Sequence, residues 1–167
     1  KVDLIIGDFD SCSEGAIQKA KEARRFPRDK DVTDLELALA AAIEKDIFSV
    51  TIITSTRGRV DHTFGNIVVA SSNRWRDLEI DLFVDDTYIK VIRDKTKLRG
   101  NPSDPVTLFA MGGTAYGITS KGLKWELDGT DLTVGSGLGI SNEFAAHEAE
   151  ISIDEGTIIS IQSLVSY

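Results

Sequence analysis

Closely spaced aspartates are the clearest chemical signal in this sequence. Asp8 and Asp10 follow the first apolar run, and Asp29 and Asp31 repeat the spacing, with Asp34 three residues further on. In an extended backbone this spacing directs both carboxylates to the same side. Mg²⁺ is a suitable counter-ion, because it prefers oxygen ligands, retains several waters and bridges to phosphate. The pattern predicts a magnesium site, and the alternative is that these aspartates serve turns and helix caps.

A second candidate site is the loop that contains Arg59, Asp61 and His62. It combines a permanent cation, an acid and an imidazole just before an expected helix. The start of a helix attracts anions, and an adjacent Arg makes a phosphate clamp. The alternative is an ordinary capped helix with a surface Arg. The loop is therefore a candidate for binding phosphate.

An aromatic side chain marks the third candidate. Trp125 lies in the segment Gly122–Trp125, and Ser141, Asn142 and Glu143 follow a glycine-rich bend. A half-exposed Trp stacks on a flat or cationic ring, whereas a buried Trp is part of the core. Both interpretations of Trp125 remain open at this point.

Standard binding motifs do not fit this sequence. Loops that begin at Asp8 or Asp29 lack the Gly and Glu that an EF-hand requires. Gly112 and Gly117 have the spacing of a P-loop, but Ile118 stands where the phosphate-binding Lys is needed. Two histidines, far apart in the chain, do not indicate zinc.

The first half of the chain must position the acidic and basic motifs. An apolar run over residues 2–6 predicts a buried strand, and the capping-box spacing of Ser11 and Glu14 predicts a helix from about Cys12 to Arg24. Thr33 and Glu36 have the same spacing, and apolar residues recur on one face of the helix that they open. Further elements are predicted from the following segments: strands over 49–54 and 80–84, and a helix capped by Asp61 that reaches about Asn73.

The pattern changes after Asp94. Short apolar runs alternate with Gly, Pro and Asp turns and predict strands over 106–110, 123–127, 132–134, 151–153 and 157–161. Asp128-Gly129 is a hairpin signal, and Asp154-Glu155-Gly156 is a candidate three-residue hairpin. We therefore expect an α/β half followed by an all-β half, in which an N-terminal Rossmann-like parallel layer precedes a C-terminal antiparallel β-sandwich. The predicted domains are an α/β domain, a linker and a β-sandwich domain: residues 1–94, 95–105 and 106–167.

Composition limits the classes of partner and compartment. The chain has 167 residues, with 27 acidic and 19 basic side chains and a net charge of −8, which argues against broad nucleic-acid binding. No apolar run is long enough to span a membrane, and the N-terminus has no signal-peptide pattern. The single cysteine, Cys12, excludes an internal disulfide, so we expect a cytoplasmic location.

Taken together and in order, five motifs resemble thiamine pyrophosphokinase. They are Gly7-Asp8-Phe9-Asp10-Ser11, Asp31-x-Thr33-Asp34, Gly58-Arg59-x-Asp61-His62, Gly122-Leu123-x-Trp125 and Ser141-Asn142-Glu143. The resemblance covers essentially the whole chain. It implies transfer of the β,γ-diphosphoryl group of ATP to the hydroxyl of thiamine, which gives thiamine diphosphate and AMP. It also implies a homodimer with the active site at the subunit interface.

The resemblance assigns roles to individual residues. Asp8, Asp10, Asp31 and Asp34 match the catalytic acidic motifs, and the first three of these are the expected Mg²⁺ ligands. The positions that match the nucleotide-binding side of the family are Ser11, Arg59 and Asp61. The positions that match the thiamine-binding side are Trp125, Ser141 and Asn142. The resemblance makes residues 1–94 the catalytic domain, which binds ATP and Mg²⁺, and residues 106–167 the thiamine-binding domain.

One departure from the family pattern opens an alternative. The family has an upstream βα unit with an Ala-Asp-Gly-Gly motif at the active site, which is absent here. Either the sequence represents an incomplete chain, so that the catalytic domain is N-terminally incomplete, or the protein lacks an active-site acid. The alternative function is therefore a non-catalytic module that binds thiamine or a nucleotide.

Overall fold

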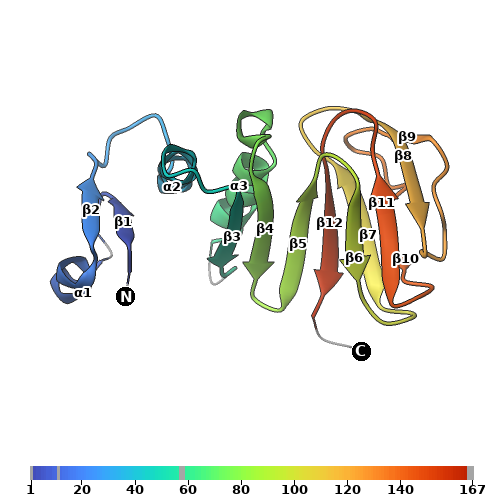
Figure 1. Ribbon diagram of the computed structural model, residues 1–167, viewed down its shortest axis with the longest axis horizontal. Coiled ribbons are helices and arrows are strands. Elements are labelled where there is room, and N and C mark those ends of the chain that lie inside the picture. Colours follow the sequence, from blue (N-terminus) through green and yellow to red (C-terminus); the bar gives the residue numbers. More distant parts are fainter. Residues whose placement is uncertain (1, 11, 57–58, 165–167) are drawn as a thin grey trace. The chain divides into compact units, whose positions relative to one another are not determined.

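The computed structural model describes residues 2–10, 12–56 and 59–164, and these fall into two compact units, 1–48 and 49–167. Figure 1 labels the helices and strands and colours them along the chain, from blue at the N-terminus to red at the C-terminus. Within the described ranges, no helix has the length and apolar character needed to cross a membrane. Each unit is described by itself below.

Unit 1 is built around a pair of parallel strands. Strand β1 (Leu4–Gly7) pairs with β2 (Glu22–Arg25), and the short helix α1 (Glu14–Lys19) connects them. The predicted helix from Cys12 to Arg24 is therefore wrong over its second half. The N-cap of α1 is Ser13, whose hydroxyl accepts from the backbone N–H of Ala16. Helix α2 (Asp34–Glu44) completes the unit.

The predicted capping box of α2 is confirmed. The hydroxyl of Thr33 accepts the Glu36 N–H at 3.2 Å, and the Glu36 carboxylate accepts the Thr33 N–H at 2.8 Å. These two bonds satisfy backbone donors that a helix start otherwise leaves unpaired. The helix buries Leu39 against the unit's interior. The cap and this packing hold Asp34, the first residue of α2, in a defined position.

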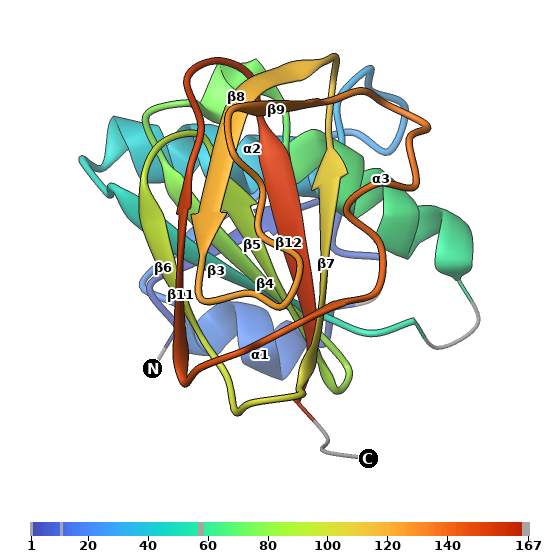
Figure 2. The ribbon, with the colours of Figure 1, turned by 90° about the vertical axis from the view of Figure 1, so that its right-hand side faces the viewer.

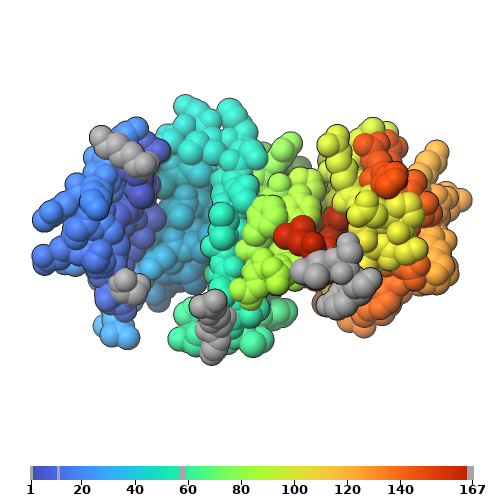
Figure 3. Space-filling model, turned by 90° about the horizontal axis from the view of Figure 1, so that it is seen from below, coloured from blue at the N-terminus to red at the C-terminus, as the bar shows by residue number. Residues whose placement is uncertain are grey.

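Unit 2 contains a six-stranded mixed sheet with the strand order β10-β7-β12-β5-β4-β3. Strands β3 and β4 are parallel, and the other neighbours are antiparallel. The C-terminal strand β12 lies between β5 and β7, and Figure 3 shows its red atoms between green and yellow ones. The bounds are β3 Ser49–Thr54, β4 Glu79–Val84, β5 Thr87–Ile92, β7 Pro105–Ala110, β10 Asn142–Glu143 and β12 Ile158–Ser163.

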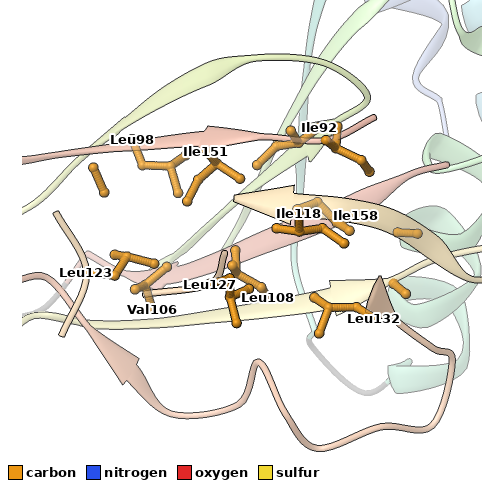
Figure 4. Packing of buried hydrophobic residues seen from close by; sticks show 14 of the residues in the cluster. Ile92, Leu98, Val106, Leu108, Ile118, Leu123, Leu127, Leu132, Ile151 and Ile158 are labelled. Atoms are coloured by element: carbon orange, nitrogen blue, oxygen red, sulfur yellow. The ribbon is translucent and has the colours of Figure 1, made fainter. Parts of the chain in front are cut away.

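A four-stranded antiparallel sheet packs on this sheet (Figure 2). Its order is β6-β11-β8-β9, with the bounds β6 Thr96–Arg99, β8 Ala115–Lys121, β9 Thr130–Leu132 and β11 Glu148–Ser152. The main core of unit 2 lies between the two sheets. Ile118 and Ile151 from the smaller sheet meet Leu108 and Ile158 from the larger one, all almost fully buried (Figure 4).

Helix α3 (Val60–Ala70) and the 3-10 helix η1 (Asn73–Trp75) connect β3 with β4. The prediction that Asp61 caps this helix is wrong. The N-cap is Arg59, and Asp61 lies within the first turn. An acid there still interacts favourably with the positive end of the helix dipole.

Several predicted strands are confirmed and others are not. The strands predicted over 49–54, 80–84 and 106–110 are present. The run over 123–127 is not a strand, and it contributes an isolated bridge between Leu123 and Phe144. The turn over 154–156 joins β11 to β12, which belong to different sheets, so it is not a hairpin. The interval 95–105, predicted as a linker, contains β6.

Candidate active site

In unit 1 the first acidic motif is a tight turn at the end of β1. The Asp8 carboxylate accepts the backbone N–H of Asp10 at 3.0 Å. Phe9 between them has φ +66°, so the extended backbone expected for this pair is wrong. The hydrogen bond from Asp10, together with the charges of Lys30 and Arg28, holds the pKa of Asp8 below its ordinary value. Asp8 is therefore ionised at neutral pH.

The start of α2 brings a second acid to this turn. The Asp34 carboxylate lies against Gly7, where an added Cβ would be 2.8 Å from Oδ2 of Asp34. Lys30 holds the same carboxylate through an ion pair of 2.9 Å. The structure thus places Asp34 at the end of β1, beside the turn that contains Asp8. Asp29 and Asp31 lie in the exposed loop before α2.

These acids fit a magnesium ion that also binds phosphate. Within the described ranges, no three His, Cys, Asp or Glu side chains lie close enough to hold a metal by themselves. Mg²⁺ does not require such a cluster, since it commonly binds through one or two carboxylates together with substrate phosphates and water. Asp8 is held ionised, and Gly7 has no side chain to displace Asp34. The donor set is therefore suitable for Mg²⁺.

In unit 2 the Arg59 loop forms an exposed ion pair. Nε and Nη2 of Arg59 donate to Oδ1 and Oδ2 of Asp61, each at 3.1 Å, and Arg59 also contacts His62. The bond from Arg59 lowers the pKa of Asp61 to about 2. The Arg59 and Asp61 side chains are 60% and 68% exposed. A guanidinium held this way presents its charge to solvent, as a phosphate-binding group must.

Trp125 lies on the surface of unit 2, so the interpretation of this residue as core is wrong. It is 54% exposed, and Nζ of Lys124 lies 4.5 Å from its ring centroid. The buried side chain of Asn142 fixes its backbone, since Oδ1 accepts the Trp125 N–H at 3.1 Å and Nδ2 donates to the Trp125 carbonyl at 2.7 Å. Trp125 is thus an exposed ring on a well-anchored segment.

Of the remaining predicted binding residues, Ser141 is described by the structure and Ser11 is not. Ser141 is exposed, has φ +58°, and donates its N–H to the hydroxyl of Thr107 at 3.2 Å. It lies next to Asn142, so the two residues share one segment. Ser11 lies outside the described residues.

The structure adds two residues that the sequence motifs did not identify, and it gives a reason for a third. Lys30 pairs with Asp34, and Asp85 binds the loop before Arg59. Gly7, the first residue of the first motif, leaves room for the Asp34 carboxylate. Lys30 adjoins the second acidic motif, so its position in the sequence was a usable signal. Asp85 comes from a distant turn, and its contacts depend on the pairing of β3 with β4.

Both parts of the chain match described families. Residues 1–82 match "Thiamin pyrophosphokinase, catalytic domain", and residues 92–158 match "Thiamin pyrophosphokinase, vitamin B1 binding domain". A protein of Bacillus subtilis (strain 168) named thiamine pyrophosphokinase is 31% identical over 169 residues, which cover 94% of this chain and 76% of that protein.

Solved structures are similar over nearly the whole chain. The thiamine pyrophosphokinase of Bacillus subtilis has a TM-score of 0.80 at 27% identity, covering 98% of this chain and 79% of that one. A thiamin pyrophosphokinase family protein from Enterococcus faecalis has a TM-score of 0.79 at 26% identity, covering 98% and 80%. These structures share the mixed and antiparallel sheets described above.

Proposed function

Because this chain belongs to the thiamine pyrophosphokinase family, we propose that it transfers the diphosphoryl group of ATP to the hydroxyl of thiamine. The products are thiamine diphosphate and AMP. The observation that carries this proposal is that both the catalytic and the vitamin-binding family descriptions match, in that order along one chain. A non-catalytic binding module is not favoured, since the catalytic match includes the acidic motifs.

We propose that the acidic residues of unit 1 serve the ATP phosphates through Mg²⁺. Asp8, Asp10 and Asp31 are the proposed ligands, and bound Mg²⁺ would neutralise phosphate charge. The lowered pKa of Asp8 supports a role as ligand rather than as proton acceptor. Asp10, Asp31 and Asp34 remain the candidates to accept the thiamine hydroxyl proton. Diphosphoryl transfer depends mainly on positioning and electrostatics, so a weak carboxylate base is sufficient.

On the nucleotide side, we propose Arg59 and Asp61, with Ser11 of the first motif. Arg59 offers a permanent cation in a planar arrangement that matches phosphate oxygens. Its bidentate bonds to Asp61 hold the guanidinium in one orientation before ATP arrives. Because the Arg59 side chain is already ordered, binding of ATP costs less side-chain conformational entropy.

On the thiamine side, we propose Trp125, Ser141 and Asn142. The exposed ring of Trp125 suits a flat cation such as thiamine. Both polar atoms of the Asn142 side-chain amide bind the backbone of Trp125. We therefore assign Asn142 the role of holding the Trp125 ring in place. Ser141 supplies an exposed hydroxyl beside it.

We also propose the finer architecture and assembly predicted from the sequence. The parallel pair β1–β2 in unit 1 and the parallel pair β3–β4 in unit 2 each support the parallel, Rossmann-like pattern predicted for residues 1–94. The packed antiparallel strands support a sandwich within 106–167. Exposed apolar side chains, Val134, Leu138 and Ile140, support a homodimer. The single cysteine supports a cytoplasmic location.

The test is an assay for AMP and thiamine diphosphate in which ATP, Mg²⁺ and thiamine are omitted in turn. We expect product only when all three are present. Retained thiamine binding without any product would favour the non-catalytic alternative instead.

In the same assay, we expect Trp125→Ala to raise the KM for thiamine about tenfold and to leave the KM for ATP nearly unchanged. A tenfold change corresponds to the loss of one ring contact of about 1–2 kcal/mol. Equal changes in both would argue against ring stacking.

A further inference from the structure

Asp85 occupies the turn between β4 and β5 in an unusual backbone conformation. Its φ is +50°, in the left-handed region that side chains other than Gly, Asn and Asp rarely adopt. Its N–H donates to the carbonyl of Thr54, the last residue of β3, at 3.3 Å. The turn therefore reaches across to the neighbouring parallel strand at the point where that strand ends.

The Asp85 carboxylate binds the two residues that follow β3. Oδ1 accepts the hydroxyl of Ser55 at 2.6 Å. Oδ2 accepts both the backbone N–H of Thr56 at 3.0 Å and its hydroxyl at 2.5 Å. Hydrogen bonds to an ionised acceptor are about twice as strong as neutral ones. Three of them on successive residues fix the direction in which the chain leaves the sheet.

These contacts continue directly to Arg59. The carbonyl of Thr56 accepts the N–H of Arg59 at 3.1 Å. The Thr63 hydroxyl lies 3.4 Å from the carbonyls of both Ser55 and Arg59, so it joins the two ends of the loop. A continuous set of hydrogen bonds thus connects the Asp85 carboxylate with the backbone from which the Arg59 guanidinium projects.

We propose that Asp85 is a positioning residue for the nucleotide side of the reaction, acting on Arg59 through Thr56. This inference rests on the proposed function, since it assigns Arg59 to the ATP phosphates. Phosphate recognition by a planar guanidinium depends on its orientation, and a displacement of about 1 Å is enough to reduce catalysis about a hundredfold. Trp125 takes part in none of the Asp85 bonds described above, so thiamine binding is separate from them.

The experiment compares two substitutions of Asp85 with a neighbouring control. Asp85→Gly removes the carboxylate and tolerates the positive φ, whereas Asp85→Asn keeps the volume and the backbone conformation but removes the charge. Asp86→Asn is the matched control, because it makes the same chemical change one residue further on, at an exposed position. Thr56→Val deletes one of the three donors.

We expect Asp85→Gly to raise the KM for ATP about tenfold, with the KM for thiamine changed less than twofold. Asp85→Asn and Thr56→Val should raise the KM for ATP by smaller factors, and Asp86→Asn should not change it. A merely structural role would lower the melting temperature without separating the two substrates. The inference is overturned if the KM for ATP is unchanged in both Asp85 variants, or if both substrates are affected equally.

Binding of a non-hydrolysable ATP analogue with Mg²⁺, measured by calorimetry on the same proteins, separates this inference from the proposed function. Should the unsubstituted protein form no product, the proposed function fails, while the analogue Kd still decides the role of Asp85. A weaker Kd in Asp85→Asn but not in Asp86→Asn supports the inference, and equal Kd values overturn it. If Asp85→Gly does not fold, the Asn variant carries the comparison.

Discussion

At the scale of single residues, Gly7 is the position where a missing side chain matters most. Its φ of +141° is strained for other residues, and a Cβ would lie 2.8 Å from Oδ2 of Asp34. We predict that Gly7→Ala displaces the Asp34 carboxylate and lowers kcat at least about tenfold. The measurement is steady-state turnover with saturating ATP, Mg²⁺ and thiamine.

Gly15→Ala is the control for this prediction. Gly15 lies in α1, and no atom lies within 4 Å of the Cβ that Ala would add. Ala is also the better helix former by about 0.5–1 kcal/mol. We therefore expect Gly15→Ala to retain full turnover. Wild-type kcat in Gly7→Ala would contradict the importance of the Asp34 position.

The Arg59–Asp61 pair makes a prediction about pH. The pKa of Asp61 is lowered to about 2 by the bond from Arg59. A carboxyl whose pKa is lower in the folded than in the unfolded chain contributes stability above its unfolded pKa, and this contribution is lost as the pH falls through the folded pKa. The pair therefore stays fully ionised at neutral pH, and its loss occurs only between about pH 4 and pH 2.

Carboxyl-carbon NMR as a function of pH measures this directly. We expect the Asp61 midpoint at about 2 in the unsubstituted protein and a rise toward the ordinary value of 3.8 in Arg59→Gln. An Asp61 midpoint that does not change in Arg59→Gln would show that the ion pair does not form in solution.

At the scale of elements, the cap of α2 determines how firmly the second acidic motif is held. We predict that Thr33→Ala lowers the free energy of opening the first turn of α2 by about 1 kcal/mol, because the backbone N–H of Glu36 loses its acceptor, the Thr33 hydroxyl. Thr33→Ser keeps the hydroxyl and should have little effect. Hydrogen exchange of the Glu36 and Leu37 amides is the measurement. Equal exchange in the two variants would mean that the cap is not formed in solution.

Local signals predicted some elements well and others poorly. The start of α2 was predictable because Thr33 and Glu36 carry the capping pattern themselves. Strand β2 was not, because Glu22 and Arg24 are good helix formers. They become a strand by pairing with β1 and through ion pairs to α2 and its C-cap, Arg24–Glu44 at 2.6 Å and Lys45–Glu22 at 2.8 Å. Such distant partners leave no local pattern.

The candidate site shows the same division. Asp8, Arg59 and Trp125 were found from residue type and spacing, since their chemistry is visible in short motifs. The task of Asn142 was not, because it depends on a segment 17 positions away. Asp85 is the extreme case, as its partners follow a different strand altogether. Sequence motifs thus identify the residues that we propose to touch ligands more readily than those that we propose to position them.

At the scale of the whole molecule, the two units differ in how many residues they bury. In the described part of unit 1, the buried residues are Gly7, Leu39, Ala41 and Ala42, and its sheet has two strands. Unit 2 has a continuous core between two sheets. Two-stranded sheets with little buried apolar surface open readily. We therefore predict that the unit with the acidic motifs is the less stable of the two.

Native-state hydrogen exchange tests this difference. We predict that amides of β1 and β2 exchange through local opening at a lower free energy than those of β12, which follow global unfolding of unit 2. Binding of an ATP analogue with Mg²⁺ should slow exchange in unit 1, because a ligand stabilises the state that binds it. Identical free energies of exchange in both units, with and without the analogue, would contradict this view.

The position of β12 in the larger sheet affects how the chain can fold during its synthesis on the ribosome. Synthesis proceeds from the N-terminus, yet β12 is an inner strand that both β5 and β7 require as their neighbour. A nascent chain that has not yet released residues 158–163 carries two unpaired strand edges, and such edges are prone to aggregation. Unit 2 therefore cannot complete its larger sheet until residues 158–163 have left the ribosome.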